Sequence, residues 1–285
     1  MIPKLLVSVS GGKSSMYMAC RLKTEYASQY DMRFVFANTG EENEATLQFV
    51  DQCDRAWNLG VVWIEATPYF TERRSTGHKI VNFETASRHG EPFEAIIKKY
   101  GIPNKAFPHC TRELKLNPIK SYTNSIGWTR NTFISAVGIR ADEPKRLRSD
   151  PQIVYPIAHW FPITKPEIND WWEQQPFNLQ LEDYQGNCKW CWKKSTSKLV
   201  RIAQETPEVF EFPGRMEANY AHLYNATPEY RRAFFRGNMN TKSLMALTAA
   251  SRTQHHPNDP DEDSGCSESC EAFMTQAAFD YSEAA

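Results

Sequence analysis

The feature that most constrains the fold is the N-terminal stretch LLVSVSGGKSSMYMA, residues 5–19, where an apolar run passes through a turn into a helical pattern. The run is typical of a short buried strand, and the residues after the turn have helical spacing. Gly11 and Gly12 stand at the junction. Such a junction directs backbone N–H groups and the positive end of the helix dipole toward one point. The sequence therefore predicts an anion-binding loop directly after the first strand.

The loop carries several groups that suit an anion. Glycines let the backbone approach closely, hydroxyl groups donate hydrogen bonds, and a lysine adds charge. The expected ligand-binding residues are Ser10, Gly11, Gly12, Lys13, Ser14 and Ser15, and Lys13 is also a candidate catalytic residue. The spacing matches neither a Walker A loop nor the dinucleotide fingerprint. It resembles the SGGxDS loop of the PP-loop nucleotide-binding superfamily, with Ser14 in the place of Asp. The resemblance implies that the loop holds the phosphates of an adenine nucleotide.

Apolar strands alternate with helical patterns along the first half of the chain. Strands are expected at about 4–9, 32–38, 61–65 and 132–139, and helices at about 13–28 and 43–59. This alternation predicts an α/β fold with a doubly wound, mostly parallel sheet, which is also the fold of the PP-loop superfamily. Ligands of such sheets lie at the carboxyl ends of the strands. We therefore expect Asn38, Thr39 and Gly40, after the second strand, to contact the adenine or ribose of the nucleotide.

Composition and charge divide the chain into three parts. We expect a nucleotide-binding domain at 1–150, an appended helical region with a Cys-x-x-Cys pair at 151–252, and an acidic tail at 253–285. Residues 96–148 hold eleven Lys or Arg against three acids, whereas residues 255–285 hold eight acids and neither Lys nor Arg. The basic stretch indicates an anionic partner, with nucleic acid as one option. The alternative is a solvated face, or one that the tail neutralises.

The sequence also indicates the compartment and the use of the cysteines. No apolar run approaches the roughly 20 residues that cross a bilayer, and no charged leader precedes the first strand. We therefore expect a cytoplasmic protein with no membrane partner. The seven cysteines are odd in number and clustered, which favours metal or redox chemistry over disulfides. Cys20 and Cys53 fall in helical apolar patterns, so we expect them in the core.

The remaining cysteines carry a second resemblance. Cys188 and Cys191, in GNCKWCWKKS, have the spacing that lets two sulfurs reach one metal or cluster, and Cys110 precedes them in FPHCTRELKLNPIKSY. This order resembles the cluster-bearing adenylylsulfate reductases, which have CCxxRKxxPL and a later Cys-x-x-Cys. The resemblance implies a 4Fe-4S cluster on Cys110, Cys188 and Cys191, and His109 takes the place of the first cysteine of the pair. The fourth iron could take His109, Cys266, Cys270, an exogenous sulfur or a small molecule. Zinc is the alternative metal, and thiols without a ligand are the remaining option.

A third match follows the strand expected at 132–139. The segment GIRADEPKR, residues 138–146, resembles the arginine-bearing segment of sulfonucleotide reductases, which implies that Arg140 and Arg146 hold the anionic end of the substrate. Together these motifs resemble the phosphoadenosine phosphosulfate reductase family over roughly residues 4–200. Within it, the SGGK loop is similar to that of phage and mobile-element variants.

Three functions remain open on these residues. The first is an oxidoreductase that reduces adenylylsulfate or its 3'-phosphate to sulfite, with Cys266 and Cys270 as catalytic thiols and a thiol as reductant. The second is an ATP pyrophosphatase or sulfurtransferase that uses ATP, Mg²⁺ and a sulfur donor to modify nucleic acid. The third is a non-catalytic nucleotide-binding module.

Overall fold

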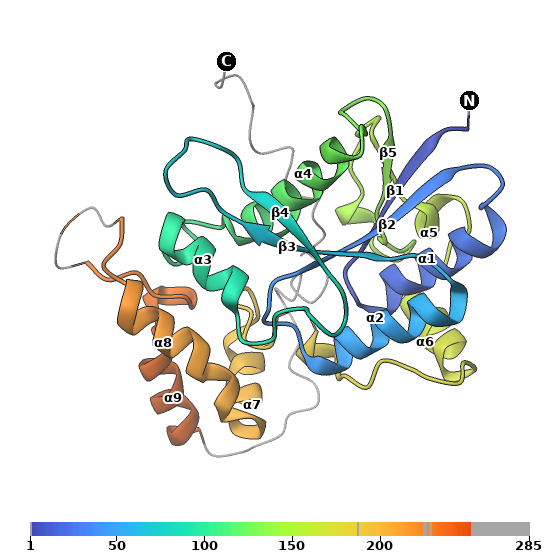
Figure 1. Cartoon of the computed structure of the whole chain (residues 1–285). Helices are drawn as coiled ribbons and strands as arrows, with labels where there is room; N and C mark the ends of the chain where they lie inside the picture. Colours follow the sequence, from blue (N-terminus) through green and yellow to red (C-terminus); the bar gives the residue numbers. More distant parts are fainter. Residues whose placement is uncertain (1, 187, 225–226, 228–229, 252–285) are drawn as a thin grey trace.

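The computed structural model describes residues 2–186, 188–224, 227 and 230–251, and its centre is one β-sheet (Figure 1). The strand order is β4-β3-β2-β1-β5-β6. All neighbouring strands pair in parallel except β3 and β4, which are antiparallel. The strands are β1 (Lys4–Val9), β2 (Asp31–Asn38), β3 (Val62–Thr67), β4 (Gly77–Val81), β5 (Ile134–Ala136) and β6 (Ile153–Val154). The predicted α/β fold with a mostly parallel sheet is therefore confirmed.

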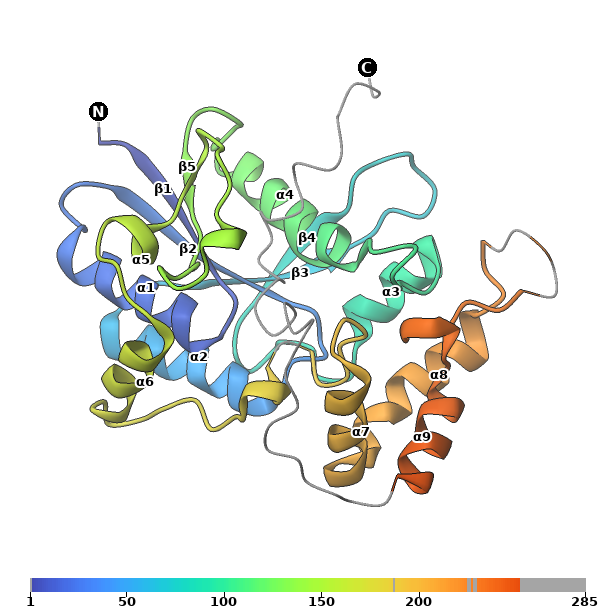
Figure 2. The same cartoon turned by 180° about the vertical axis from the view of Figure 1, so that it is seen from behind.

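Helices cover both faces of the sheet, as Figures 1 and 2 show from opposite sides. One face packs against α1 (Lys13–Glu25), α2 (Glu44–Trp57) and α6 (Lys165–Glu173). The other packs against α4 (Asn117–Ser125). Between them, α5 (Pro156–His159) follows β6 and contributes one residue to each side.

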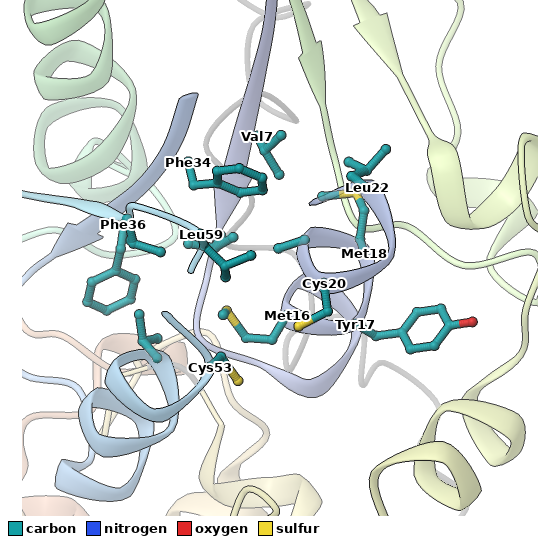
Figure 3. Close-up of a cluster of buried hydrophobic side chains, with 14 of the residues drawn as sticks. Val7, Met16, Tyr17, Met18, Cys20, Leu22, Phe34, Phe36, Cys53 and Leu59 are labelled. Atoms are coloured by element: carbon teal, nitrogen blue, oxygen red, sulfur yellow. The ribbon is translucent and has the colours of Figure 1, made fainter. Parts of the chain in front are cut away.

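The central strand β1 shows why this layering forms. Leu5, Val7 and Val9 point into the core under α1 and α2, whereas Leu6 points into the core under α4. A strand that is covered on both faces needs a continuous apolar run instead of an alternating one. Figure 3 shows the α1 and α2 side of this core, including Cys20 and Cys53. Both cysteines are buried, as expected, and burial raises the pKa of the Cys53 thiol.

A second group of helices, which includes α3, lies away from α1 (Figure 1). It consists of α3 (Glu91–Tyr100), α7 (Thr196–Glu205), α8 (Glu211–Tyr220) and α9 (Thr241–Ala250), which share a hydrophobic cluster with the Cys-x-x-Cys segment. Shorter turns complete the chain: η1 (Arg112–Leu116), η2 (Pro144–Arg146), η3 (Asp183–Gln185), η4 (Pro207–Phe210) and η5 (Arg236–Asn238). None of the helices described is long and apolar enough to cross a membrane.

The expected element boundaries hold closely for the first three strands and two helices. The strand expected at 132–139 is shorter, because β5 pairs with β1 over three residues only. Beyond it the chain passes so close to α1 that a Cβ at Gly138 would lie 3.0 Å from the Cα of Ser15. The domain boundary at residue 150 stays a prediction.

Candidate functional site

The loop between β1 and α1 has the backbone geometry of an anion site. Gly11 has a φ of +79°, and a Cβ there would lie 2.4 Å from the Cγ2 atom of Thr46, so glycine is required. Gly12 is the N-cap of α1, and its helix end has no side-chain cap. The first N–H groups of a helix have no partner inside it, so those of α1 are available to a ligand in front of the loop.

The three serines of the loop have different partners. The hydroxyls of Ser10 and Ser15 lie 3.0 Å apart, and the Ser15 hydroxyl donates to the carbonyl oxygen of Gly12 at 3.0 Å. These bonds hold the turn closed. The Ser14 hydroxyl instead accepts from Nη1 of Arg140 at 3.1 Å. Ser14 thus joins the loop to the arginine segment after β5.

A cleft in front of the loop brings together segments that are far apart in the sequence. Ser10, Gly12, Lys13, Ser14 and Ser15 line it, together with Arg140 and Arg146. Arg140 is buried and pairs with Asp142 at 2.9 Å, and both arginines pair with Glu143. The structure therefore brings together the loop and the two arginines that the sequence singled out.

Lys13 differs from these arginines. Its side chain lines the cleft, and among the described residues its ammonium group has no hydrogen-bond partner or counter-ion. Its carbonyl oxygen accepts a hydrogen bond from the indole N–H of Trp172 at 3.0 Å. The backbone of the loop is thereby tied to α6, while the charge at the end of the side chain is left for a ligand.

The second wall of the cleft comes from a region that the sequence analysis did not assign to the site. It consists of Lys165, Ile168, Asn169, Leu179, Leu181, Glu182, Asp183 and Gly186. Lys165 pairs with Asp183 at 2.7 Å. One part of this wall could have been recognised in the sequence. Thr164 and Glu167 form a capping box, which marks the start of α6.

The residues expected to contact adenine or ribose lie elsewhere. Asn38 is fully buried, and its amide donates to Oε1 of Glu65 at 2.7 Å and to the carbonyl oxygen of Ser87 at 2.9 Å. Gly40 has a φ of +81° and packs against Gly90. Thr39 lies beside Cys188, with 3.5 Å between Oγ1 and Sγ. None of the three is among the described residues that line the cleft, and their contact with a nucleotide stays a prediction.

A second cavity gathers the three cysteines expected to bind a cluster. Cys110, Cys188 and Cys191 line it together with Thr39, Lys115 and the apolar side chains of Phe93, Leu114, Trp190 and Trp192. In the described part of the chain, no group of three His, Cys, Asp or Glu side chains is arranged to hold a single metal ion. The structure thus places the three cysteines around one largely apolar space.

A π-helical turn shapes the Cys110 side of this cavity. The backbone N–H of Asn117 bonds to the carbonyl oxygen of Arg112, so the turn closes over five residues. Lys115 within this turn and Cys110 just before it both line the cavity. Such turns are frequent at functional sites.

His109, the alternative ligand, lies next to Cys110 in the chain. Burial and the neighbouring Arg112 lower the pKa of His109 to about 4. Its Nε2 atom is buried and has no hydrogen-bond partner within the part of the chain that the structure describes. His109 is thus neutral and has one unsatisfied ring nitrogen.

The loop after β2 anchors the Cys-x-x-Cys segment. Glu41 accepts from the indole N–H of Trp190 at 2.5 Å, and its carbonyl oxygen accepts from the backbone N–H of Lys189 at 2.9 Å. Glu42 forms a backbone bridge with Cys188. The residues that follow β2 therefore support the cysteine cavity instead of the cleft.

Cys266, Cys270 and the acidic tail lie outside the described residues. The catalytic roles expected for the two cysteines stay predictions.

The comparisons with known proteins give two sequence relatives. No protein-family model matches the chain. It is 32% identical, over 97% of both chains, to the "Uncharacterized nin region protein ORF290" of Escherichia phage lambda. It is also 26% identical to the "Uncharacterized protein MJ0066" of Methanocaldococcus jannaschii, over 78% of this chain and 43% of that protein. The chain thus spans less than half the length of the archaeal relative.

A solved structure gives a much weaker match. The crystal structure of phosphoadenylyl-sulfate reductase from Candida auris, in a phosphate complex, aligns with a TM-score of 0.38 and 13% identity. The alignment covers 62% of this chain and 75% of that one. A similarity this low assigns no activity.

Proposed function

The chain belongs to the family of the nin region protein ORF290 of phage lambda, and we propose that it binds an adenine nucleotide and performs sulfur chemistry next to it. One observation carries this proposal. The cleft unites the glycine–serine loop with Arg140 and Arg146, from segments about 125 residues apart in the chain. This is the combination expected for the anionic end of a nucleotide.

The loop is proposed to hold the phosphates. The uncapped N-terminus of α1 offers backbone N–H groups, and Lys13 offers a charge without a protein counter-ion in the described residues. Both favour negative charge at the same place, since the helix dipole and the ammonium group act in the same direction. Arg140, which bonds to Ser14 of the loop, and Arg146 add positive charge beside it, although both also pair with Glu143.

The cysteine cavity is proposed to hold an iron–sulfur cluster. Three thiol ligands suit iron and sulfide. The proposal is supported by the position of the three thiols, which line one largely apolar cavity. Cys110, Cys188 and Cys191 would hold the cluster, and His109 is the neighbouring candidate for a fourth ligand.

The proposed reaction is reduction of adenylylsulfate or its 3'-phosphate. A cysteine thiolate attacks the sulfur, the bond from sulfur to the phosphate oxygen breaks, and the electron pair leaves with the adenosine phosphate. The sulfonate that remains on the cysteine is displaced as sulfite by a second thiol, which leaves a disulfide. An external thiol reductant then restores the two thiols. Cys266 and Cys270 are proposed for these two roles.

ATP-driven sulfur transfer is the second candidate. It is favoured by Lys13, whose ammonium group has no counter-ion among the described residues and would suit a triphosphate with Mg²⁺. An acceptor oxygen, on nucleic acid for example, would attack the α-phosphorus and release pyrophosphate. A sulfur donor would then displace AMP.

The products distinguish these reactions. The chain, purified without oxygen, is incubated with adenylylsulfate or its 3'-phosphate and a thiol reductant, or with ATP, Mg²⁺, nucleic acid and sulfide. We expect sulfite and the matching adenosine phosphate from the first mixture. Pyrophosphate and AMP from the second mixture alone would favour sulfur transfer. Nucleotide binding without turnover in either mixture would leave a binding module.

A further inference from the structure

The two walls of the cleft differ in chemistry. Arg140 and Arg146, with their counter-ion Glu143, make one wall charged, whereas Ile168, Leu179 and Leu181 make part of the other apolar. A ligand that consists of phosphate alone needs only the first wall. A cleft that has both kinds of wall suits a molecule that is anionic at one end and flat and apolar at the other.

The apolar wall is held at a fixed place relative to the loop. Ile168 is 1% exposed and belongs to the hydrophobic core, so its side chain holds α6 against that core. The indole N–H of Trp172 bonds to the carbonyl oxygen of Lys13 at 3.0 Å, which ties α6 to the first residue of α1. The distance between the phosphate loop and the wall is therefore set before any ligand binds.

Two leucines extend this wall beyond α6. Leu179 and Leu181 lie in a segment without regular structure, are half-buried, and line the cleft. Leucines in a charged cleft leave apolar surface in contact with water, and a ligand that covers them gains free energy. Asn169 lines the same wall and offers an amide for the polar edge of such a ligand.

The end of β2 offers no comparable surface. The amide of Asn38 is satisfied by Glu65 and Ser87, and Gly40 faces the backbone of Gly90 at close range. We therefore infer that Leu179 and Leu181, with Ile168 behind them, form the surface on which the base of the nucleotide lies. This inference rests on the proposed nucleotide binding and names the subsite that separates a nucleotide from a plain polyphosphate.

The test compares ligands with and without a base. Leu179→Asn and Leu181→Asn keep the side-chain size and remove its apolar character, and Leu247→Asn on α9 is the control at an exposed leucine. Affinities for ATP, adenylylsulfate, its 3'-phosphate and inorganic tripolyphosphate are measured by calorimetry on the full chain, with circular dichroism as the check of folding. For each cleft variant we expect roughly tenfold weaker binding of the nucleotide that the wild type binds. Tripolyphosphate should bind within about twofold of the wild type.

The outcomes separate this inference from the proposed function. If the wild type binds none of ATP, adenylylsulfate and the 3'-phosphate of adenylylsulfate, the proposed function fails. If it binds one of them and the folded variants bind it equally well, only the base-binding surface is wrong. A loss of equal size for nucleotide and tripolyphosphate would also overturn the inference, since it would show a disturbed phosphate site.

Discussion

The ammonium group of Lys194 donates to the carbonyl oxygen of Gly186 at 2.7 Å and to that of Cys188 at 3.1 Å. Gly186 lines the cleft and Cys188 lines the cysteine cavity, so one buried lysine binds the walls of both sites. Lys194 is only 2% exposed. A charge at this depth is tolerated because several carbonyl oxygens surround it.

Replacement of this lysine should loosen the segment that separates the two sites. Lys194→Met leaves buried carbonyl groups without their donor, and we expect the free energy of unfolding to fall by about 1–3 kcal/mol. Lys242→Met, at the exposed start of α9, should change it by less than about 0.5 kcal/mol. Urea denaturation measures both. Equal stability of the two variants would contradict the structural role of Lys194.

A pair of glycines tests the geometry of the loop. Gly11 and Gly60 both have a positive φ, but a Cβ at Gly60 would meet no atom within 4 Å, whereas one at Gly11 would lie 2.4 Å from Thr46. Gly60→Ala should therefore cost about 1 kcal/mol of stability for backbone strain alone. Gly11→Ala should cost clearly more, because α2 must also shift. Similar losses in thermal unfolding of the two variants would show that the loop does not pack against α2 in this way.

The cysteine cavity predicts a coloured protein. After purification without oxygen, the chain should be brown and contain roughly four iron and four sulfide. Cys110→Ser, Cys188→Ser and Cys191→Ser should each bleach it, whereas Cys20→Ala, in the core between α1 and α2, should keep the colour. If the purified chain contains stoichiometric zinc and no iron, the cluster assignment is wrong and the cysteines form a zinc site.

The buried Glu41 predicts a pH dependence of stability. Burial raises the pKa of this carboxyl from about 4.5 to about 7, although the indole of Trp190 opposes the shift. The folded chain then binds more protons than the unfolded chain between these pH values, so stability falls as pH rises through this window and levels off above it. The total change is about 3 kcal/mol.

Glu41→Gln keeps an acceptor for Trp190 and removes the titration. Relative to this variant, the wild type should lose stability between pH 5 and pH 8, as measured by denaturation at both values. If the difference between the two proteins is the same at both pH values, Glu41 does not titrate as described.

Much of the fold could be predicted because local pattern and tertiary role agree. The apolar run of β1 is buried on both faces, and Gly11 has the left-handed backbone that a strand-to-helix turn requires. The antiparallel β4 could not be predicted, since its residues Gly77 to Val81 lie at the sheet edge and carry no clear alternation. The π-helical turn at 112–116 depends on the packing around Glu113, which a sequence pattern does not show.

The candidate site could be predicted only in part. The loop and Arg140 were found because each has a charged or glycine-rich motif. Leu179 and Leu181 have no motif, and their place in the cleft follows from where α6 packs. Asn38 has the expected position at the end of β2, yet its amide bonds to Glu65 of β3. The strand of Glu65 was predictable, but this pairing of side chains between two strands was not.

The most direct test of the account is the binding of adenine nucleotides to the wild type and to Lys13→Ala, with Lys23→Ala at the other end of α1 as control. Removal of a charge-assisted contact is worth about 1.5–3 kcal/mol, so Lys13→Ala should bind ATP or adenylylsulfate about tenfold to hundredfold more weakly. Lys23→Ala should match the wild type. Unchanged affinity in Lys13→Ala would contradict the assignment of the loop as the phosphate site.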